Sequence, residues 1–267
     1  MTTTKKGTTV HTSKIQPGEL VTMEFSFYNV TYIRGFTSML TVVCKKTRML
    51  WVLPTAHKRE PVHIIRFILT SLMNKQHPCK MLRVDKDSAL ENSKYVTYLL
   101  VDEFRISMET SGGDISWINR KNERHNRSIN YMVSKALLDS DQHENKWCCA
   151  AEISAEVHRR RMYSALENIS PHFAWYVRNP RIHELRAFGC DIYPIKYSPK
   201  KLDNRTQEGS ITSYTKSRAT MKWWTHTKRD SNNVHLQNFM STTITLAKFG
   251  HQALNLCLAQ IIPPFQH

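Results

Sequence analysis

Three short β-rich runs follow one another near the start of the chain, and they constrain the fold more than any other feature. Leu20 to Phe27 alternates apolar and polar residues, and Phe36 to Val43 and Arg48 to Leu53 are apolar and β-branched. Runs of this kind predict strands. The separators, Tyr32 to Gly35 and Lys45 to Thr47, are short enough for hairpins. The sequence therefore predicts three antiparallel strands in succession.

Helices and strands are then expected to alternate. Apolar residues at helical spacing predict a helix that has Pro61 in its first turn and ends near Lys75. The elements expected after it are a strand at Cys79 to Val84, a helix at Glu91 to Val101, a strand at Phe104 to Met108, a loop at Thr110 to Asp114 and a long helix from about Ile118. This order predicts an α/β fold with a ribonuclease H-like mixed sheet, in which three antiparallel strands precede alternating strands and helices.

The second half of the chain is expected to hold a helical segment and then a small β-rich C-terminal region. A helical stretch is predicted from Trp147 to Leu166, and short β-like pieces are predicted after Pro171. The expected divisions are a flexible basic segment at 1–17, the core at 18–140, a helical extension at 141–178, a β-rich basic region at 179–240 and a tail at 241–267.

The charge of the chain favours a polyanionic partner. Lys and Arg number 38 against 22 acidic residues, which gives a formal net charge of +16. Residues 1–84 carry 13 bases and 3 acids, and residues 196–229 carry 9 bases and 2 acids. Two basic zones that flank a near-neutral middle suggest a nucleic-acid partner, and the alternative is a soluble protein whose surfaces are merely basic.

Other classes of protein receive no support from the sequence. The six cysteines form no CxxC pair and no regular framework, so we interpret them as reduced thiols. No apolar run approaches the ~18 residues of a membrane span, and no signal sequence is recognisable. We expect a protein that is neither secreted nor membrane-bound.

Two acidic residues suggest a metal site. Asp85 follows the predicted strand Met81 to Val84, and Glu123 lies on the predicted long helix. A carboxylate at a strand end and another on a following helix are the hard oxygen ligands that a two-Mg²⁺ phosphoryl-transfer site requires. Taken singly, Asp85 is also compatible with a turn, and Glu123 with a surface acid paired to Arg127.

Several motifs, in order, resemble the integrase catalytic core of Copia-type (Ty1-like) LTR-retrotransposon polyproteins. The resemblance spans roughly residues 15–240 with gaps. The matching segments are Gly18 to Val21, Arg48 to Pro54, Leu82 to Asp85, Asn119 with Glu123 to Ile129, His183 to Cys190, and Lys201 to Asp203.

The resemblance implies a function and a set of site residues. Members of this family transfer phosphoryl groups with two metal ions held by an Asp, Asp, Glu triad, so Asp85 and Glu123 correspond to the second and third acids. Glu24 stands where the family has its first aspartate, in the middle of the first strand. The implied cofactor is Mg²⁺ or Mn²⁺, the implied partner is double-stranded DNA, and a homo-oligomer and a nuclear, otherwise cytoplasmic, location are expected. No zinc module resembling the family's precedes Glu24.

Departures from the family pattern bear on activity. Glu24 is one methylene longer than Asp, Lys86 brings a cation beside the site, and Arg120 replaces a glycine. We interpret the chain as a degenerate, truncated copy of such an element. Three hypotheses follow: an integrase core, a catalytically inactive nucleic-acid-binding remnant of the same fold, and a nuclease that cleaves RNA–DNA hybrids.

Basic and aromatic residues complete the candidate surface. Lys121, Arg124 and Arg127 around the candidate metal site, together with Lys86, are predicted to contact phosphates. The run Arg159 to Arg161 is interpreted as a solvated helix face. The pair Trp223-Trp224 suits the core of a small β-domain, or alternatively base stacking.

Overall fold

The chain forms two compact units in the computed structural model. The first is made of Met1–Tyr131 and Ala155–Pro180, and the second of Met132–Ser154 and Arg181–His267. The structure describes residues 15–32, 34–56, 62–85, 90–91, 93–111, 116–193, 201, 206, 208–214, 221–225 and 239–242. At 85, 111, 116–124, 221–225 and 239–242 it describes the backbone only.

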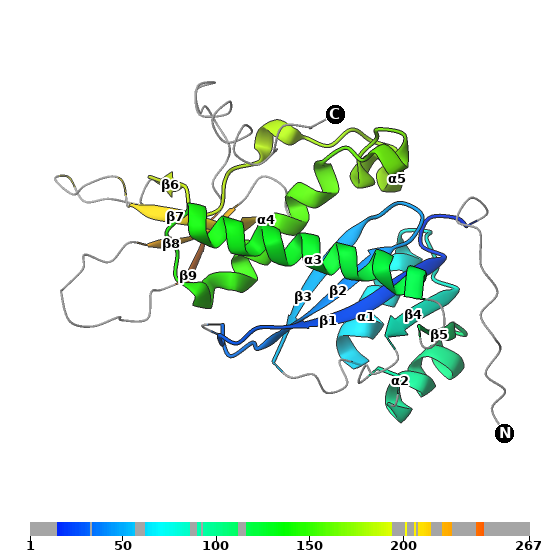
Figure 1. Ribbon diagram of the computed structural model, residues 1–267. Helices are drawn as coiled ribbons and strands as arrows, with labels where there is room; N and C mark the ends of the chain where they lie inside the picture. The colour runs from blue at the N-terminus through cyan, green and yellow to red at the C-terminus, as the bar shows by residue number, and fades with distance from the viewer. Residues whose placement is uncertain are drawn as a thin grey trace. The chain divides into compact units, whose positions relative to one another are not determined.

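A mixed five-stranded sheet forms the centre of the first unit (Figure 1). Its strands are β1 (Leu20–Phe27), β2 (Ser38–Cys44), β3 (Leu50–Thr55), β4 (Met81–Asp85) and β5 (Ser107–Ser111), in the order β3-β2-β1-β4-β5. The first three pair antiparallel, β4 pairs parallel to β1, and β5 pairs parallel to β4. This is the order and direction of strands in a ribonuclease H-like fold, and the predicted fold class is confirmed.

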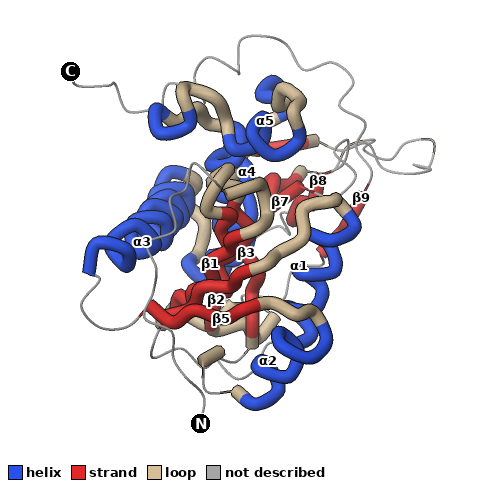
Figure 2. Tube along the Cα trace, turned by 90° about the vertical axis from the view of Figure 1, so that its right-hand side faces the viewer, coloured by secondary structure: helices blue, strands red, loops and turns tan. Residues whose placement is uncertain are grey.

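Helices cover both faces of this sheet. Helix α1 (Val62–Asn74) and helix α2 (Lys94–Tyr98), which continues into the π-helical turn η2 (Leu99–Glu103), lie on one side. The part of α3 (Ser116–Asp139) that belongs to this unit, up to Tyr131, lies on the other (Figure 2). The remaining helices are α4 (Trp147–Arg160), the 3₁₀ turn η4 (Ser164–Leu166) and α5 (Pro171–Tyr176). Ser93 caps α2 by accepting a hydrogen bond of 3.2 Å from the Val96 N–H.

The apolar core lies between the sheet and α1. Val21 and Met23 of β1 join the helical stripe of α1, whose buried residues are Ile65, Ile68, Leu69 and Leu72. Successive strand residues face opposite sides of a sheet, so Glu24 faces away from this core.

A glycine fixes the entry into β1. Gly18 has φ +87°, and a Cβ there would stand 2.4 Å from the carbonyl oxygen of His77. Only glycine allows both this backbone conformation and this close approach. The contact brings the start of β1 against the segment that leads into β4, which favours the parallel pairing of these two strands.

Two predictions about local structure were wrong. The fifth strand lies at Ser107–Ser111 instead of Phe104 to Met108, because η2 extends to Glu103 and the Phe104 N–H bonds to the carbonyl of Leu99 at 3.1 Å. It therefore includes Thr110 and Ser111, which were expected in a loop. Residues 171–176 form α5, where β-like pieces were expected after Pro171, although these residues also lie within the helical extension expected at 141–178.

The start of α5 explains the second of these errors. Ser170 accepts a hydrogen bond from the Phe173 N–H at 3.1 Å, and Pro171 occupies the first turn. Serine followed by proline is a helix start, although proline was interpreted as a break.

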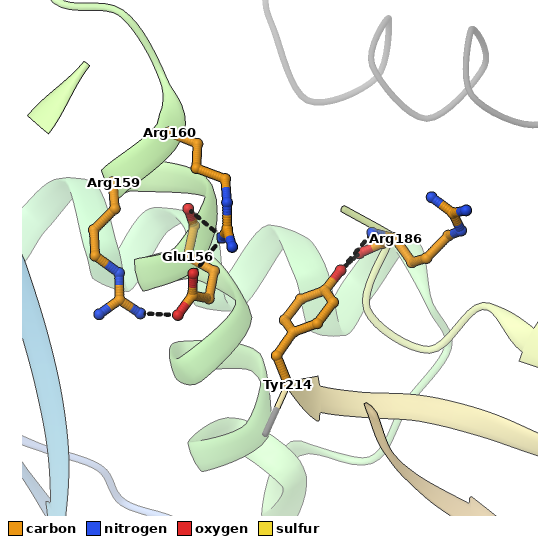
Figure 3. Close-up of polar contacts among 5 residues, drawn as sticks. All are labelled: Glu156, Arg159, Arg160, Arg186 and Tyr214. Atoms are coloured by element: carbon orange, nitrogen blue, oxygen red, sulfur yellow. Dashed lines mark hydrogen bonds and ion pairs between the residues drawn. The ribbon is translucent and has the colours of Figure 1, made fainter. Parts of the chain in front are cut away.

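The second unit contains a four-stranded antiparallel sheet. Its strands are β6 (Asp191–Ile192), β7 (Gly209–Tyr214), β8 (Met221–Thr225) and β9 (Phe239–Thr242), paired in that order. Two 3₁₀ turns, η3 (Glu144–Lys146) and η5 (Ile182–Glu184), also belong to it. Tyr214 at the end of β7 donates to the Arg186 carbonyl at 3.0 Å and accepts from the Arg186 N–H (Figure 3). The side chains of Trp223 and Trp224 lie outside the description, so their role stays a prediction.

Two further observations concern the helices and the cysteines. No helix within the described residues is long and apolar enough to cross a lipid bilayer. Cys44, Cys79, Cys148, Cys149 and Cys190 are free thiols. The domain boundaries expected from the sequence stay a prediction.

Candidate active site

Two of the three candidate acids occupy one row of the central sheet. Met23 of β1 pairs with Val84 of β4 in parallel register. One residue further along each strand come Glu24 and Asp85, so their backbones are neighbours on strands ~4.8 Å apart. The row continues on both sides, because Glu24 pairs with Thr41 in β2 and Asp85 pairs with Ser111 in β5.

The surroundings of the row differ from those of the apolar core. Glu24 is half-buried on the sheet face opposite α1, and it has interactions with its surroundings. The structure describes the backbone of Asp85 at the C-terminal end of β4 but not its side chain. Ligands of α/β proteins commonly bind at such strand ends.

Helix α3, which carries Glu123, runs beside β1 in the same direction. Tyr28, just beyond β1, donates a hydrogen bond of 2.9 Å to Oδ1 of Asn130. Earlier in the helix, His125 lies within the electrostatic reach of Lys45, whose N–H bonds to the carbonyl of Leu20 at the start of β1. Figure 1 shows the same direction for the helix and the strand.

The hydrogen bond between Tyr28 and Asn130 gives a common reference point for the positions of Glu24 on β1 and Glu123 on α3. Glu123 is seven helical residues, ~10.5 Å, before Asn130. Glu24 is four strand residues, ~13 Å, before Tyr28. The backbones of Glu123 and Glu24 therefore lie at comparable distances from the same bond, while the side chain of Glu123 lies outside the description.

An ion pair lies two residues closer to the start of the strands, on the same face of the sheet as the row. Arg83 of β4 and Glu109 of β5 are register partners, and Arg83 donates to Oε2 of Glu109 from both Nε, at 3.1 Å, and a terminal nitrogen, at 2.8 Å. The Arg83 side chain is 9% exposed and that of Glu109 is 26% exposed. This pair joins two adjacent strands two residues before the row of Glu24 and Asp85, and nothing in the sequence indicated it.

The predicted phosphate-contacting bases are only partly described. Arg127 is exposed on α3. Lys121 and Arg124 lie on the same helix, but their side chains are outside the description, and Lys86 is outside the described residues altogether. Their roles stay predictions.

The donors present suit a hard divalent cation. Mg²⁺ prefers carboxylate oxygens in octahedral geometry, and Glu24 and Asp85 on adjacent strands bring two carboxylate-bearing residues to one row. The side chains that the structure describes include no cluster of three or more His, Cys, Asp or Glu suited to a metal. The side chains of Asp85 and Glu123 are not among them.

A second polar group lies at the end of α4, and the sequence interpretation missed it. His158 is 2% exposed, and its Nδ1 shares a hydrogen bond of 2.8 Å with the Tyr163 hydroxyl. The ring of His125 lies 5.8 Å from that of His158 between centroids. Burial, followed by the charges of Arg48 and Lys45, lowers the pKa of His125 to about 4. Burial, followed by the neighbouring His125 and then by Arg159 and Arg161, lowers the pKa of His158 to about 3.

The arginines beside this group correct one interpretation. Glu156 binds both Arg159 and Arg160 in ion pairs (Figure 3). The side chains of these arginines are only 16% and 12% exposed. The interpretation of the run as a solvated helix face was wrong for these two residues, whereas Arg161 is exposed. Glutamate three and four residues before an arginine is the signal that could have indicated this.

Comparisons with known proteins find similarity at the level of structure only. No model of a protein family matches the sequence, and no curated protein matches it. Among solved structures, the chain is similar to the HTLV-2 integrase catalytic core domain in complex with magnesium, in its trimeric form, with 14% identity, a TM-score of 0.46 and coverage of 60% of this chain and 98% of that one. The dimeric form of the same domain is similar with 14% identity and a TM-score of 0.45, and the match covers 59% of this chain and 96% of that one. The assignment of the fold therefore rests on the strand order and direction.

Proposed function

We propose that this chain is an integrase-like core that binds DNA and catalyses phosphoryl transfer at the row formed by Glu24 and Asp85, together with Glu123 of α3. The observation that carries the proposal is the parallel register of β1 and β4, which brings two acid-bearing positions side by side in a ribonuclease H-like sheet. The Copia-type resemblance of the segments around Asp85 and Glu123 supports the same function.

Each residue of the site then has a definite task. Glu24, Asp85 and Glu123 hold divalent cations with their carboxylates. When bound, Mg²⁺ or Mn²⁺ lowers the pKa of an attacking water or 3′-hydroxyl and stabilises the charge on the leaving oxygen. Arg127, exposed on α3, and the neighbouring Lys121 and Arg124 hold the phosphate backbone in register.

A second candidate function is a nucleic-acid-binding remnant without catalysis. Glu24 favours it, because an added methylene displaces a carboxylate by ~1 Å, and a misplacement of that size costs roughly 100-fold in rate. Lys86, the residue after Asp85, adds a cation where metal ions would bind.

A nicking and strand-transfer assay on end-labelled duplex DNA, with Mg²⁺ or Mn²⁺, tests the first candidate against the second. We expect weak metal-dependent activity that Asp85→Asn abolishes. Asp102→Asn is the matched control, because Asp102 is an exposed aspartate in η2 of the same unit. Activity that persists in Asp85→Asn, or no activity in the native chain and in Glu24→Asp, overturns the enzymatic proposal.

A further inference from the structure

Two segments more than a hundred residues apart in sequence bring basic side chains to one region of the first unit. One is the turn between β2 and β3, with Lys45, Lys46 and Arg48, and the other is the end of α4, with Arg159, Arg160 and Arg161. We call these six residues the cationic cluster.

Contacts around His158 connect the two segments. The Arg161 guanidinium lies 5.3 Å from the centroid of the Tyr163 ring, and Tyr163 is hydrogen-bonded to His158. The backbone of Arg48 favours the charged form of His158, and the charges of Arg48 and Arg161 both act on Tyr163. The turn and the helix end therefore face the same buried group.

The balance of charge in the cationic cluster is strongly positive. The segments 45–48 and 156–161 carry six Lys and Arg residues and one carboxylate, Glu156. That carboxylate is shared between Arg159 and Arg160. The histidines add no charge at neutral pH, because burial and these cations hold the pKa of His125 and His158 well below the ordinary value.

The cations are also partly ordered before any partner binds. Packing and ion pairing hold Arg159 and Arg160, and Arg48 has a positive φ of 56°, which is uncommon for a residue with a side chain. Charges held in place against a low-dielectric surface lose less entropy and act more strongly on a bound anion than flexible surface lysines do.

We propose that the cationic cluster is a binding surface for the phosphate backbone of duplex nucleic acid, in which Lys45, Lys46 and Arg161 contact phosphates and the less exposed Arg159 and Arg160 add to the positive field. The inference deepens the proposed function and rests on it for the choice of DNA as the polyanion. Guanidinium groups bind phosphate oxygens in two-point contacts without reading sequence. A duplex suits the surface better than a single strand, which would need aromatic platforms for stacking, and Tyr163 is already engaged by His158 and Arg161.

The cluster and the acidic row are a short distance apart along the sheet. Thr41 is the partner of Glu24 in β2, and Lys45 follows four residues later. Four strand residues span ~13 Å, which corresponds to about four base steps at 3.4 Å each. A duplex held at the cluster therefore has phosphates within a few base steps of the proposed site.

Anisotropy titrations of a fluorescent 30-base-pair duplex test the proposal, with chelator present so that metal plays no part. The variant is Lys45→Gln with Lys46→Gln and Arg161→Gln. The control removes three exposed bases elsewhere in the same unit: Arg34→Gln, Lys94→Gln and Arg178→Gln. We expect the triple variant to bind the duplex on the order of 10- to 100-fold more weakly than the native chain at 0.1 M salt. The slope of the logarithm of its binding constant against the logarithm of the salt concentration should be smaller in magnitude by about 3. The control should stay within about threefold of the native chain.

A gain-of-affinity variant covers the case in which the triple variant fails to fold. Glu156→Gln removes the carboxylate shared by Arg159 and Arg160, so it should tighten binding and steepen the salt dependence. Equal losses in the triple variant and its control, unchanged binding in the triple variant, weaker binding in Glu156→Gln or tighter binding of a single strand would each overturn the proposal. Cluster-dependent binding without metal-dependent cleavage would remove the enzymatic function and leave this surface intact.

Discussion

The ion pair between Arg83 and Glu109 should control the stability of the sheet that carries the candidate site. These residues pair across β4 and β5, and the Arg83 side chain is 9% exposed. Glu109→Leu would leave the guanidinium inside the structure without the carboxylate that accepts its two hydrogen bonds. A buried charge without its partner carries most of its desolvation cost.

The size of the effect follows from the burial of the two partners. Removing one partner of a fully buried pair costs ~3–5 kcal/mol. Because Glu109 is 26% exposed, water can reach part of the site, and we expect ~3 kcal/mol for Glu109→Leu. With ~2–4 °C per kcal/mol for a domain of 150–250 residues, the melting temperature should fall by ~6–12 °C. The double variant Arg83→Met with Glu109→Leu should recover most of this loss, since apolar residues of similar size can replace a buried pair at little cost.

Thermal and urea unfolding of the native chain, both single variants and the double variant measure this as a double-mutant cycle. The reasoning would be refuted if Glu109→Leu cost less than ~1 kcal/mol, or if the double variant were less stable than both single variants. Either result would mean that the pair is solvated and contributes as little as an ordinary surface ion pair. Lys135→Leu serves as the comparison, because its pair with Asp139 is exposed, and it should change stability by less than ~1 kcal/mol.

Three further predictions concern activity, acid stability and the backbone. Glu24→Asp should raise metal-dependent nicking by up to ~100-fold by restoring the shorter carboxylate, and an unchanged or lower rate in the nicking assay would contradict this. Because the folded pKa values of His125 and His158, about 4 and about 3, lie below the ordinary 6.5, the unfolded chain binds protons first as pH falls. The free energy of unfolding should therefore decrease from pH 6.5 towards pH 4, by on the order of 1–2 kcal/mol per histidine at pH 5. Urea unfolding at pH 7 and pH 5 should show a smaller decrease in His125→Phe than in the native chain. An equal decrease would disprove the assignment of this acid sensitivity to His125. Gly18→Ala should destabilise the fold by ~2 kcal/mol or more, since the added Cβ meets a backbone oxygen at 2.4 Å. Gly35→Ala should cost only ~1 kcal/mol in the same thermal unfolding experiment, because Gly35 has φ +83° but open space around it.

Local patterns were sufficient for the elements with strong periodicity. The bounds of β1 were predicted as Leu20 to Phe27 and are the same in the structure. The helical stripe predicted α1, and the short separators predicted both hairpins. In each case the residues that decide the element lie within a dozen positions of one another, so the signal is contained in the sequence itself.

The candidate site was predictable only in its parts. The sequence singled out Glu24, Asp85 and Glu123 as acids on a strand, at a strand end and on a helix. Their spatial relation depends on the parallel pairing of β1 with β4, in which Met23 meets Val84. A shift of one residue in this register would turn the row to the other face, and no local pattern specifies the register between strands that are more than fifty residues apart.

The sequence by itself determined the class of fold, the basic character of the chain and the acids of the candidate site, because periodicity, charge and motif order are properties of neighbouring residues. Only the tertiary structure decided which charges are buried. Arg83 with Glu109, and Glu156 with Arg159 and Arg160, are half-buried pairs, and the turn at Arg48 joins the end of α4 around a neutral histidine. Burial and long-range proximity arise when distant segments pack against each other, and they set the electrostatics of this protein in ways that composition cannot show.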